Sequence, residues 1–260
     1  MSTFEAIFLG IIQGLTEFLP ISSSGHLKLM QALLGMQDLD QYILFDLICH
    51  LGTLGAIFIF FRAEIQSMLS SNRTRLMQLG LATLPLVPLA IFLKPIETFY
   101  QQPNLIGYFF LATALLLYLG IRFGKTLPPE AQQKSRWKAP FFIGCFQALA
   151  IFPGISRSGA TISGARMLGW NMQEALTFSF LMAIPAILGG ITIETLKLLT
   201  SSATLPSISF VSYSAGMLTA LGVGYCSLFF LQRMIIHQRF IYFAWYCLGL
   251  GIAAIIYFNF

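Results

Sequence analysis

The chain has 260 residues, of which 57% are hydrophobic and 10% are charged, and its mean hydropathy is +0.77. A soluble domain cannot bury this much apolar surface in one core, so the composition predicts a polytopic integral membrane protein. The net charge of +5 is typical of cytoplasmic loops, and no basic stripe interleaved with aromatic residues indicates a nucleic-acid partner. Four cysteines lie in apolar stretches without paired spacing, which indicates neither disulfides nor a metal site.

The first polar stretch, GLTEFLPISSSGH at residues 14–26, interrupts an apolar run that begins at Phe4. A carboxylate, three hydroxyls and an imidazole beside hydrocarbon indicate a functional site. The flanking segments 4–19 and 25–34 are both shorter than the roughly 20 residues that a membrane span needs, and Pro20 with the serines separates them. The sequence therefore predicts a re-entrant helical hairpin with a polar tip.

Six longer apolar segments follow, and each is long enough to be a transmembrane helix. They cover residues 43–61, 78–94, 105–122, 177–196, 209–231 and 241–259. Between the third and the fourth lies a second broken stretch, residues 139–164, which contains PGISRSGATISG. We expect it to form a second re-entrant hairpin.

The two broken stretches are similar to each other. Residues 8–15 align with residues 142–149, and single-residue gaps then align three further pairs: Ser22 with Ser156, Ser24 with Ser158 and Gly25 with Gly159. The segment 45–55 aligns more weakly with 178–189. The sequence thus predicts an all-α fold in one integral membrane domain over residues 1–260, with repeat one at about 4–122 and repeat two at about 139–259.

Each repeat is expected to hold one hairpin and three spanning helices, and an odd number of crossings inverts the second repeat relative to the first. The loops 62–77, 122–138 and 232–240 carry ten basic residues, whereas the alternate loops carry only Lys94 and Lys197. The positive-inside rule then places both termini and the mouth of the first hairpin outside the cell. The second hairpin enters from the cytoplasm, so the two tips should meet near the membrane midplane.

The two tips together are suited to bind an anion. We expect a short helix to start near Ser23 or Ser24 and another near Ser158, and helix N-termini attract negative charge. Arg157 adds a guanidinium, which recognises phosphate in a bidentate manner. Glu17 is also able to pair with Arg157 and simply hold the halves together, so a structural role stays open.

Chemistry at the first tip is assigned to a histidine and to the serines. His26 is either a satisfied core histidine or an acid, base or nucleophile on the first turn of a helix that faces an anion. Serines 22–24 are either helix caps or include a nucleophile that a histidine or carboxylate activates. We favour Ser23 as the reactive serine because it aligns with Arg157 in the other repeat.

Other polar residues have two readings each. Gln13, one turn before Glu17, either binds substrate or orients the carboxylate, although its counterpart Gln147 suggests packing. Asp46 and His50 share a helix face and either line the cavity or satisfy irregular hairpin backbone, and we favour the second. Thr161 either donates to phosphate or bonds back to its own helix.

The motifs GLTEFLPISSSGH and PGISRSGATISGA resemble the two signatures of the undecaprenyl-diphosphate phosphatase family, the bacitracin-resistance type of integral membrane phosphatase. The resemblance runs from about residue 4 to residue 260. It implies hydrolysis of undecaprenyl diphosphate to undecaprenyl phosphate and inorganic phosphate, which recycles the lipid carrier for peptidoglycan. It also implies the bacterial cytoplasmic (inner) membrane, with the site open to the periplasmic side.

By this resemblance the catalytic residues are Glu17, His26, Ser23 and Arg157. The substrate-binding set comprises Gln13, Ser22, Ser24, Gly25, Ser156, Ser158, Gly159 and Thr161. The family has Glu or Gln at the position of Gln13, and the glutamine here argues against a cation held tightly by protein carboxylates. We expect Mg²⁺ or Ca²⁺ to arrive with the diphosphate and assign no residue as a metal ligand.

The expected reaction is phosphoryl transfer that depends on positioning and electrostatics, with Ser23, His26 or water as the nucleophile. The expected partners are a polyprenyl diphosphate lipid and the bilayer, with no nucleic acid; a homodimer stays open. An inverted repeat with broken helices is also typical of transporters. The alternative function is therefore a transporter or flippase for a lipid phosphate or another anion.

Overall fold

The computed structural model describes residues 1–36, 42–91, 102–200 and 208–259, and every regular element in these ranges is a helix. In chain order the helices are α1 (Thr3–Phe18), α2 (Ser23–Leu33), α3 (Ile43–Phe60), α4 (Arg62–Ser70), α5 (Arg73–Thr83), α6 (Leu86–Ile91), α8 (Pro103–Phe123), α9 (Pro129–Lys134), α10 (Lys138–Leu149), α11 (Arg157–Met167), α12 (Met172–Thr200), α13 (Phe210–Ile236) and α14 (Ile241–Asn259). The prediction of an all-α fold is confirmed.

Five of the described helices are long and apolar enough to cross a membrane: α3, α8, α13, α14 and the part of α12 from Met172 to Lys197. They match five of the six predicted spans, so the chain is a multi-pass membrane protein. The predicted span 78–94 differs, because α5 and α6 are separate helices with a turn at Leu84 and Pro85. Proline has no N–H to continue the helical ladder. Residues 92–94 lie outside the described residues.

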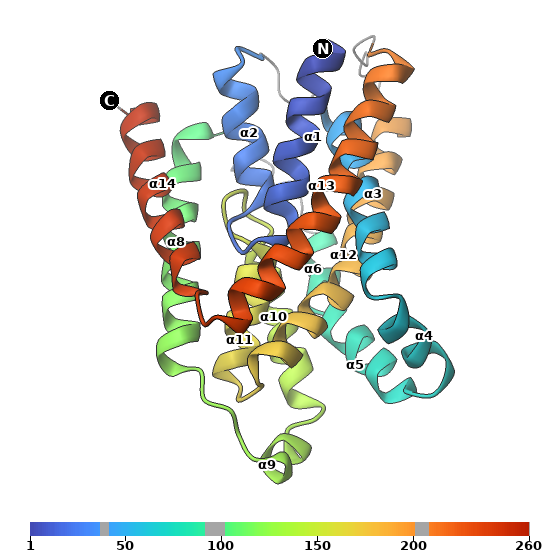
Figure 1. Cartoon of the computed structure of the whole chain (residues 1–260), viewed down its shortest axis with the longest axis vertical. Helices are drawn as coiled ribbons and strands as arrows, with labels where there is room; N and C mark the ends of the chain where they lie inside the picture. The colour runs from blue at the N-terminus through green and yellow to red at the C-terminus, as the bar shows by residue number, and fades with distance from the viewer. Residues whose placement is uncertain (37–41, 92–101, 201–207, 260) are drawn as a thin grey trace.

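Helices α1 and α2 form one hairpin and α10 and α11 form another, and the two lie in opposite halves of the molecule with their tips together (Figure 1). Helix α1 ends at Phe18, and its C-cap Leu19 is extended because a residue that precedes proline avoids the helical region. Helices α2 and α11 begin at Ser23 and Arg157. These starts agree with the predicted ones within one residue.

Small residues allow the helices to pack closely. Helix α1 packs along α13, where a Cβ atom added to Gly14 would lie 2.8 Å from the backbone nitrogen of Gly224. Helix α8 packs along α14 in the same way, since a Cβ at Gly107 would lie 2.7 Å from the carbonyl oxygen of Gly251. Apolar helices in lipid associate through such small-residue contacts, because lipid provides no hydrophobic drive. The first contact holds the hairpin helix α1 against α13, and the second joins the long helices α8 and α14.

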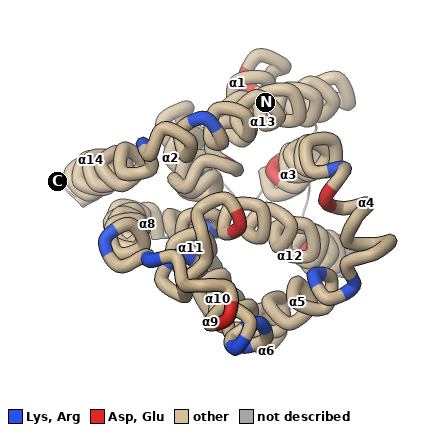
Figure 2. Tube along the Cα trace, turned by 60° about the horizontal axis from the view of Figure 1, so that its bottom comes forward, with Lys and Arg blue, Asp and Glu red and all other residues tan. Residues whose placement is uncertain are grey.

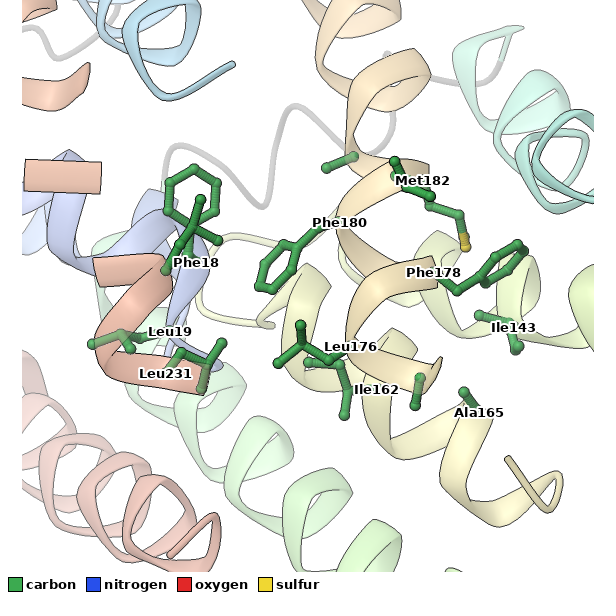
Figure 3. Packing of buried hydrophobic residues seen from close by; sticks show 14 of the residues in the cluster. Phe18, Leu19, Ile143, Ile162, Ala165, Leu176, Phe178, Phe180, Met182 and Leu231 are labelled. Atoms are coloured by element: carbon green, nitrogen blue, oxygen red, sulfur yellow. The ribbon is translucent and has the colours of Figure 1, made fainter. Parts of the chain in front are cut away.

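The buried core lies beside the hairpin tips and links them to α12 (Figure 3). The rings of Phe18 and Phe180 meet edge to face with 5.6 Å between centroids, and Trp170 contacts Phe178 at 4.9 Å. Aromatic pairs in this arrangement add to the stabilisation that burial provides. The last turn of α1, which carries the polar tip, is therefore held by rigid packing.

Basic residues gather at one end of the molecule. Figure 2 shows Lys and Arg on α5, at the end of α8 and around α9 and α10. In Figure 1 these elements lie in the lower half, while both chain ends lie at the top. The loops that differ in charge in the sequence therefore also differ in position.

Candidate active site

The site lies where the two hairpin tips meet. Glu17, on the last turn of α1, accepts a hydrogen bond at Oε1 from Nη2 of Arg157, the first residue of α11, at 2.5 Å. Both side chains are largely buried, with exposed fractions of 5% and 16%. Ser158 Oγ also donates to the Leu19 carbonyl at 3.2 Å, and the Gly154 amide donates to Ser22 Oγ at 3.1 Å. The expected meeting of the tips is observed.

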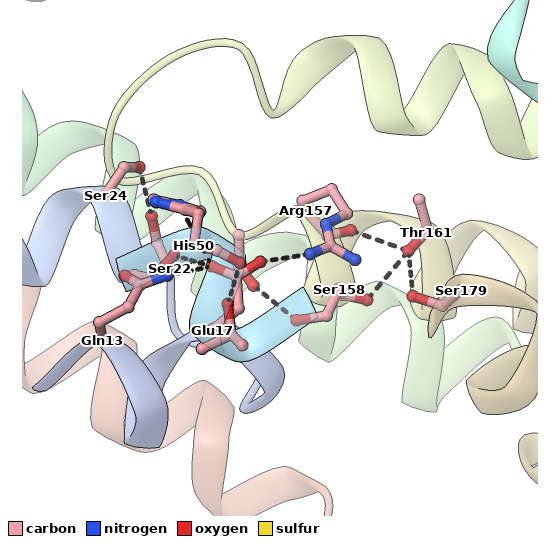
Figure 4. Close-up of polar contacts among 12 residues, drawn as sticks. Gln13, Glu17, Ser22, Ser24, His50, Arg157, Ser158, Thr161 and Ser179 are labelled. Atoms are coloured by element: carbon pink, nitrogen blue, oxygen red, sulfur yellow. Dashed lines mark hydrogen bonds and ion pairs between the residues drawn. The ribbon is translucent and has the colours of Figure 1, made fainter. Parts of the chain in front are cut away.

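Glu17 is the centre of the polar network (Figure 4). Its Oε2 atom accepts hydrogen bonds from Ser23 Oγ at 2.6 Å and from Gln13 Nε2 at 3.1 Å. The Gln13 bond follows from helical spacing, because residues four apart lie on one face. Ser23 lies next to the carboxylate because α2 starts immediately after the turn. A serine hydroxyl donating to a buried carboxylate is the arrangement that activates oxygen nucleophiles.

Arg157 keeps one end of its guanidinium unpaired. Nη2 binds Glu17, whereas the buried Nη1 has no hydrogen-bond partner in the described part of the chain. A buried donor without a partner is destabilising and requires an explanation. A guanidinium binds phosphate through two parallel N–H groups, so Nη1 is a donor that an anion between the tips would satisfy.

The serines at both tips cap the returning helices. Ser22 Oγ accepts from the Gly25 amide at 3.4 Å and Ser156 Oγ accepts from the Gly159 amide at 3.0 Å. Ser24 shares a contact with Ser22 at 3.4 Å between the two hydroxyls. The first amides of α2 and α11 have no partner within their helices and carry partial positive charge. Two helix N-termini thus converge with Arg157, as an anion site requires.

The two predicted glycines allow the tips to come close. A Cβ atom at Gly25 would lie 2.8 Å from the ring of Phe110 and 2.9 Å from the Cα of Gly154. At Gly159 it would lie 3.3 Å from the Pro20 carbonyl. Both positions therefore favour glycine because neighbouring atoms leave little space: Phe110 and Gly154 at Gly25, and Ser156 and the Pro20 carbonyl at Gly159.

His26 lies in the wall between α2, α8 and α14. Its Nδ1 contacts the Ser22 carbonyl at 2.7 Å and its Nε2 contacts the Tyr246 hydroxyl at 2.8 Å. The ring stacks on Tyr246 and meets Phe110 edge to face. Both nitrogens are thus engaged there rather than with Glu17 or Arg157.

Thr161 bonds back to its own helix, which is one of its two predicted roles. Its hydroxyl donates to the Arg157 carbonyl at 2.8 Å and shares a 2.6 Å contact with the hydroxyl of Ser179 on α12. This geometry ties the first turn of α11 to α12. Thr161 thereby supports the backbone of Arg157.

Within the described residues, the contacts of Asp46 and His50 contradict the favoured reading, because neither side chain bonds to irregular hairpin backbone there. Asp46 Oδ1 accepts a hydrogen bond from the Gln31 side chain at 3.0 Å, and His50 Nε2 lies 3.6 Å from Oε2 of Glu17. The helical spacing placed them on one face, but the crossing of α3 with α1 decides what that face meets. Figure 4 shows His50 beside the Glu17 network.

Sequence reasoning missed three supporting hydroxyls. Thr113 on α8 donates to the Gly154 carbonyl at 2.8 Å and accepts from the Ser156 amide at 2.9 Å. Tyr246 and Ser179 contact predicted residues from α14 and α12. A buried hydroxyl in an apolar span is a signal for such roles, although it does not name the partner.

A cation held by protein ligands alone would need several oxygen donors. Glu17 offers one carboxylate, and both of its oxygens already accept bonds from neighbours. No group of three or more His, Cys, Asp or Glu side chains gathers anywhere in the described ranges. Mg²⁺ and Ca²⁺ require six or more oxygen ligands, so this donor set fits a cation only when the ligand brings oxygens of its own.

An apolar groove lies between the end of α1 and α13. It is lined by Leu15, Leu19, Gly222, Val223, Cys226, Ser227 and Phe230. Leu15 and Phe230 are about half exposed, and no heavy atom lies within 4 Å of a Cβ atom added to Gly222. The groove borders the helical turn that carries Glu17.

A family model described as bacitracin resistance protein BacA matches residues 6–253. The chain belongs to the BacA family. A BacA relative from Protochlamydia amoebophila, named undecaprenyl-diphosphatase, is 48% identical over the full length of both chains. Relatives of the same name from Carboxydothermus hydrogenoformans and Rhodopirellula baltica are 36% and 37% identical, over 98% and 97% of this chain and 97% and 96% of their own. The family resemblance drawn from the two motifs is confirmed.

Proposed function

We propose that this BacA-family protein hydrolyses undecaprenyl diphosphate to undecaprenyl phosphate and inorganic phosphate. The observation that carries the proposal is the chain Ser23–Glu17–Arg157, which ends in the unpaired buried Nη1 atom of Arg157. It joins an activated hydroxyl to a phosphate-binding donor across two converging helix N-termini. The names of the relatives support the same reaction.

In the proposed mechanism, the diphosphate enters between the tips and binds Arg157 and the first amides of α2 and α11. These groups stabilise the charge that develops on the transferring phosphoryl group. Glu17 accepts a proton from Ser23, or from a water that Ser23 positions. His26 is the second catalytic candidate, as proton donor or as nucleophile. The remaining substrate-binding residues hold the two tips in position.

A divalent cation, Mg²⁺ or Ca²⁺, is proposed to accompany the diphosphate. Oxygens of Glu17 and Ser23 are the protein donors that would hold it, together with oxygens of the substrate. Such a cation would neutralise phosphate charge. The test is phosphate release after chelation, followed by restoration with each cation.

The same proposal assigns a topology of six spans, with α5 and α6 as one crossing, two re-entrant hairpins and an inverted repeat. The packing supports it, because α1 of one repeat packs on α13 of the other, just as α10 packs on α5 and α6. The basic end would face the cytoplasm. The site then opens to the periplasmic side of the bacterial cytoplasmic membrane.

We further assign the isoprenoid tail to the apolar groove between α1 and α13. The groove is open beside the turn that carries Glu17, and its lining is almost wholly apolar. Gly222→Leu should fill it and raise KM for undecaprenyl diphosphate severalfold, with a smaller effect on farnesyl diphosphate. Gly189→Leu is the matched control, since a Cβ there also meets nothing within 4 Å. If both variants raised KM equally, the groove would not be the binding site of the tail.

The deciding experiment measures inorganic phosphate released by the purified protein from undecaprenyl diphosphate. Glu17→Ala, Ser23→Ala, His26→Ala and Arg157→Ala are compared with the wild-type protein. We expect release by the wild-type protein and large losses in the variants. If all four kept wild-type turnover, the site assignment would be wrong. Anion exchange in liposomes without phosphate release would instead support the transporter.

A further inference from the structure

A small pocket at the basic end of the molecule is lined by residues of α4, α5 and α12. Its volume is about 140 Å³, and it shares no lining residue with the Glu17 network. In Figure 1, α4 and α5 lie in the lower half, beside the lower ends of the long helices. The span α3 ends at Phe60, directly before α4, and the span α12 begins at Met172. The pocket therefore reaches the surface of the membrane at the level of the lipid headgroups.

The pocket combines a small volume with several polar groups. Five of the residues that line it have polar side chains: Glu64, Ser67, Asn72, Arg75 and Thr177. A few polar groups in a concave site fix the orientation of a ligand, and sites for drug-sized molecules begin at about 300 Å³. This pocket is therefore suited to a single headgroup rather than to a large soluble ligand.

Arg75 is held at the pocket by two aromatic rings. The centre of its guanidinium lies 5.2 Å from the ring centroid of Trp170 and 4.6 Å from that of Phe178. The face of an aromatic ring attracts a cation, but it does not provide an acceptor oxygen for the guanidinium N–H groups. Arg75 is partly buried, and its guanidinium makes no hydrogen bond or ion pair within the described residues. The rings thus position a fork of donors that is free to bind a phosphate.

Glu64 brings the opposite charge to the same pocket. It lies in the first turn of α4, is exposed, and forms no ion pair in the part of the chain that the structure describes. Arg75 and Glu64 therefore line one pocket without pairing with each other. Glu174, in the first turn of α12, also acts electrostatically on Arg75. Because both signs of charge are present, the pocket favours a ligand that carries both over a simple anion.

We propose that this pocket binds the headgroup of a phospholipid that carries a phosphate and a primary ammonium group, as phosphatidylethanolamine does. The guanidinium of Arg75 donates to the phosphate, and the carboxylate of Glu64 accepts from the ammonium group. A quaternary ammonium has no N–H to donate, and a glycerol headgroup has no positive charge for Glu64. The site is separate from the one proposed for phosphate release, and no step of that reaction enters the inference.

One turn of α12 joins the pocket to the hairpin tips. Thr177 lines the pocket, and Phe178 lies against the guanidinium of Arg75. The next residue, Ser179, shares a 2.6 Å hydroxyl contact with Thr161 of α11. A ligand that binds the folded protein and not the unfolded chain stabilises the fold. Occupation of the pocket should therefore raise the unfolding temperature of the whole protein.

The first measurement compares lipids that differ only in the headgroup. Dioleoyl phosphatidylethanolamine, phosphatidylcholine and phosphatidylglycerol are added in equal amounts to the purified protein in detergent, and thermal unfolding is recorded. We expect phosphatidylethanolamine to raise the unfolding temperature by about 5 °C, and each of the other two lipids to raise it by about 1 °C or less. Soluble O-phosphoethanolamine at the same concentration should have no effect, because it lacks the acyl chains.

The second measurement locates the site with matched variants. Arg75→Gln and Glu64→Gln should each weaken binding of phosphatidylethanolamine by about 10-fold, as counted by native mass spectrometry, and should lose the thermal shift. Arg73→Gln and Glu130→Gln are the controls, because both residues are exposed and neither lines the pocket. Glu130 also matches Glu64 in its place in the first turn of a helix. The controls should respond to the lipid as the wild-type protein does.

Ser67→Trp provides a steric test that keeps both charges. Ser67 is exposed on α4, so the variant should fold even if Arg75→Gln does not, and the indole should fill the pocket and abolish the shift. No shift with phosphatidylethanolamine, or an equal shift with phosphatidylcholine or phosphatidylglycerol, would overturn the proposal. A wild-type response in Ser67→Trp and Glu64→Gln would place the lipid elsewhere, and an equal response to O-phosphoethanolamine would exclude a lipid-specific site. None of these outcomes depends on phosphate release, so this site and the proposed function are tested separately.

Discussion

The two hairpins turn at their tips in a similar way but use different residues for the turn. In each, a serine caps the returning helix through the amide of a glycine three residues later. The first hairpin places the left-handed conformation at Ser22, with φ of 70°, whereas the second places it at Gly154, with φ of 106°. Gly154, which is the extra residue of the second motif when the two are aligned, thus shares a positive φ with Ser22 of the first. Similar geometry survives a change in length because one residue per tip absorbs the turn.

The hairpins differ most in charge. The first contributes the carboxylate Glu17 and the second contributes the guanidinium of Arg157. The glutamine that the repeats share also differs in its surroundings, since Gln13 donates to Glu17 while the buried amide of Gln147 has no partner within the described ranges. Two similar hairpins can thus contribute different functional groups to one site. In the proposed mechanism, the first tip supplies the proton acceptor and the second binds the anion.

The largest effect is expected from breaking the pair across the tips. Glu17→Gln and Arg157→Lys should each lower kcat/KM on the order of 10³-fold, because one removes the base and the other removes the bidentate fork. Phosphate release from undecaprenyl diphosphate measures this. The double variant Glu17→Gln with Arg157→Gln removes both charges and should regain stability but not activity. Recovery of activity would mean that the pair only joins the two halves.

Comparing variants of Ser23 and Ser156 distinguishes a catalytic role of a serine from a helix-capping role. Ser23→Ala removes the hydroxyl that donates to Glu17 and should lower kcat by about 100-fold or more with little loss of stability. Ser156→Ala removes a cap and should lower the free energy of unfolding by about 1 kcal/mol, with a smaller loss of kcat. Thermal unfolding in detergent and phosphate release distinguish the two. The reverse pattern would assign the chemistry to the second tip.

Gly154→Ala tests whether the second tip depends on its inserted glycine. A Cβ there would lie 2.7 Å from Cβ of Phe109 and 2.9 Å from the Ile106 carbonyl, at a φ that favours glycine. We expect a loss of about 2 kcal/mol or more in stability, from strain and overpacking. Gly249→Ala is the control, because a Cβ at that position meets nothing within 4 Å. An unchanged unfolding temperature would show that the turn relaxes.

The smallest effect is expected at the glutamine pair. Gln147→Met removes a buried amide that has no partner in the described chain and should leave stability unchanged or raise it by about 1 kcal/mol. Gln13→Met removes a hydrogen bond to Glu17 and should lower kcat by about 10-fold. Thermal unfolding and turnover, measured side by side, compare the two variants. Equal turnover in both variants would mean that Gln13, too, has only a packing role.

Much of the site could be predicted locally. Pro20 ends α1, Ser22 and Ser156 are helix caps by residue type, and four-residue spacing placed Gln13 beside Glu17. The contact between Glu17 and Arg157 is one of the alternatives that the sequence left open, because the two tips were expected to meet. The second predicted span was less predictable, because counting apolar residues overlooked the turn at Pro85.

The sequence by itself determined the membrane class, the two polar tips and the residues that they carry, because hydropathy, proline and cap residues act within a few positions of the chain. Only the tertiary structure decided that His50 faces Glu17 while His26 faces Tyr246. Those contacts join helices far apart in the chain, and their register depends on where the backbones cross. Such crossings follow from packing between small residues, as at Gly14 and Gly224, which periodicity alone does not specify.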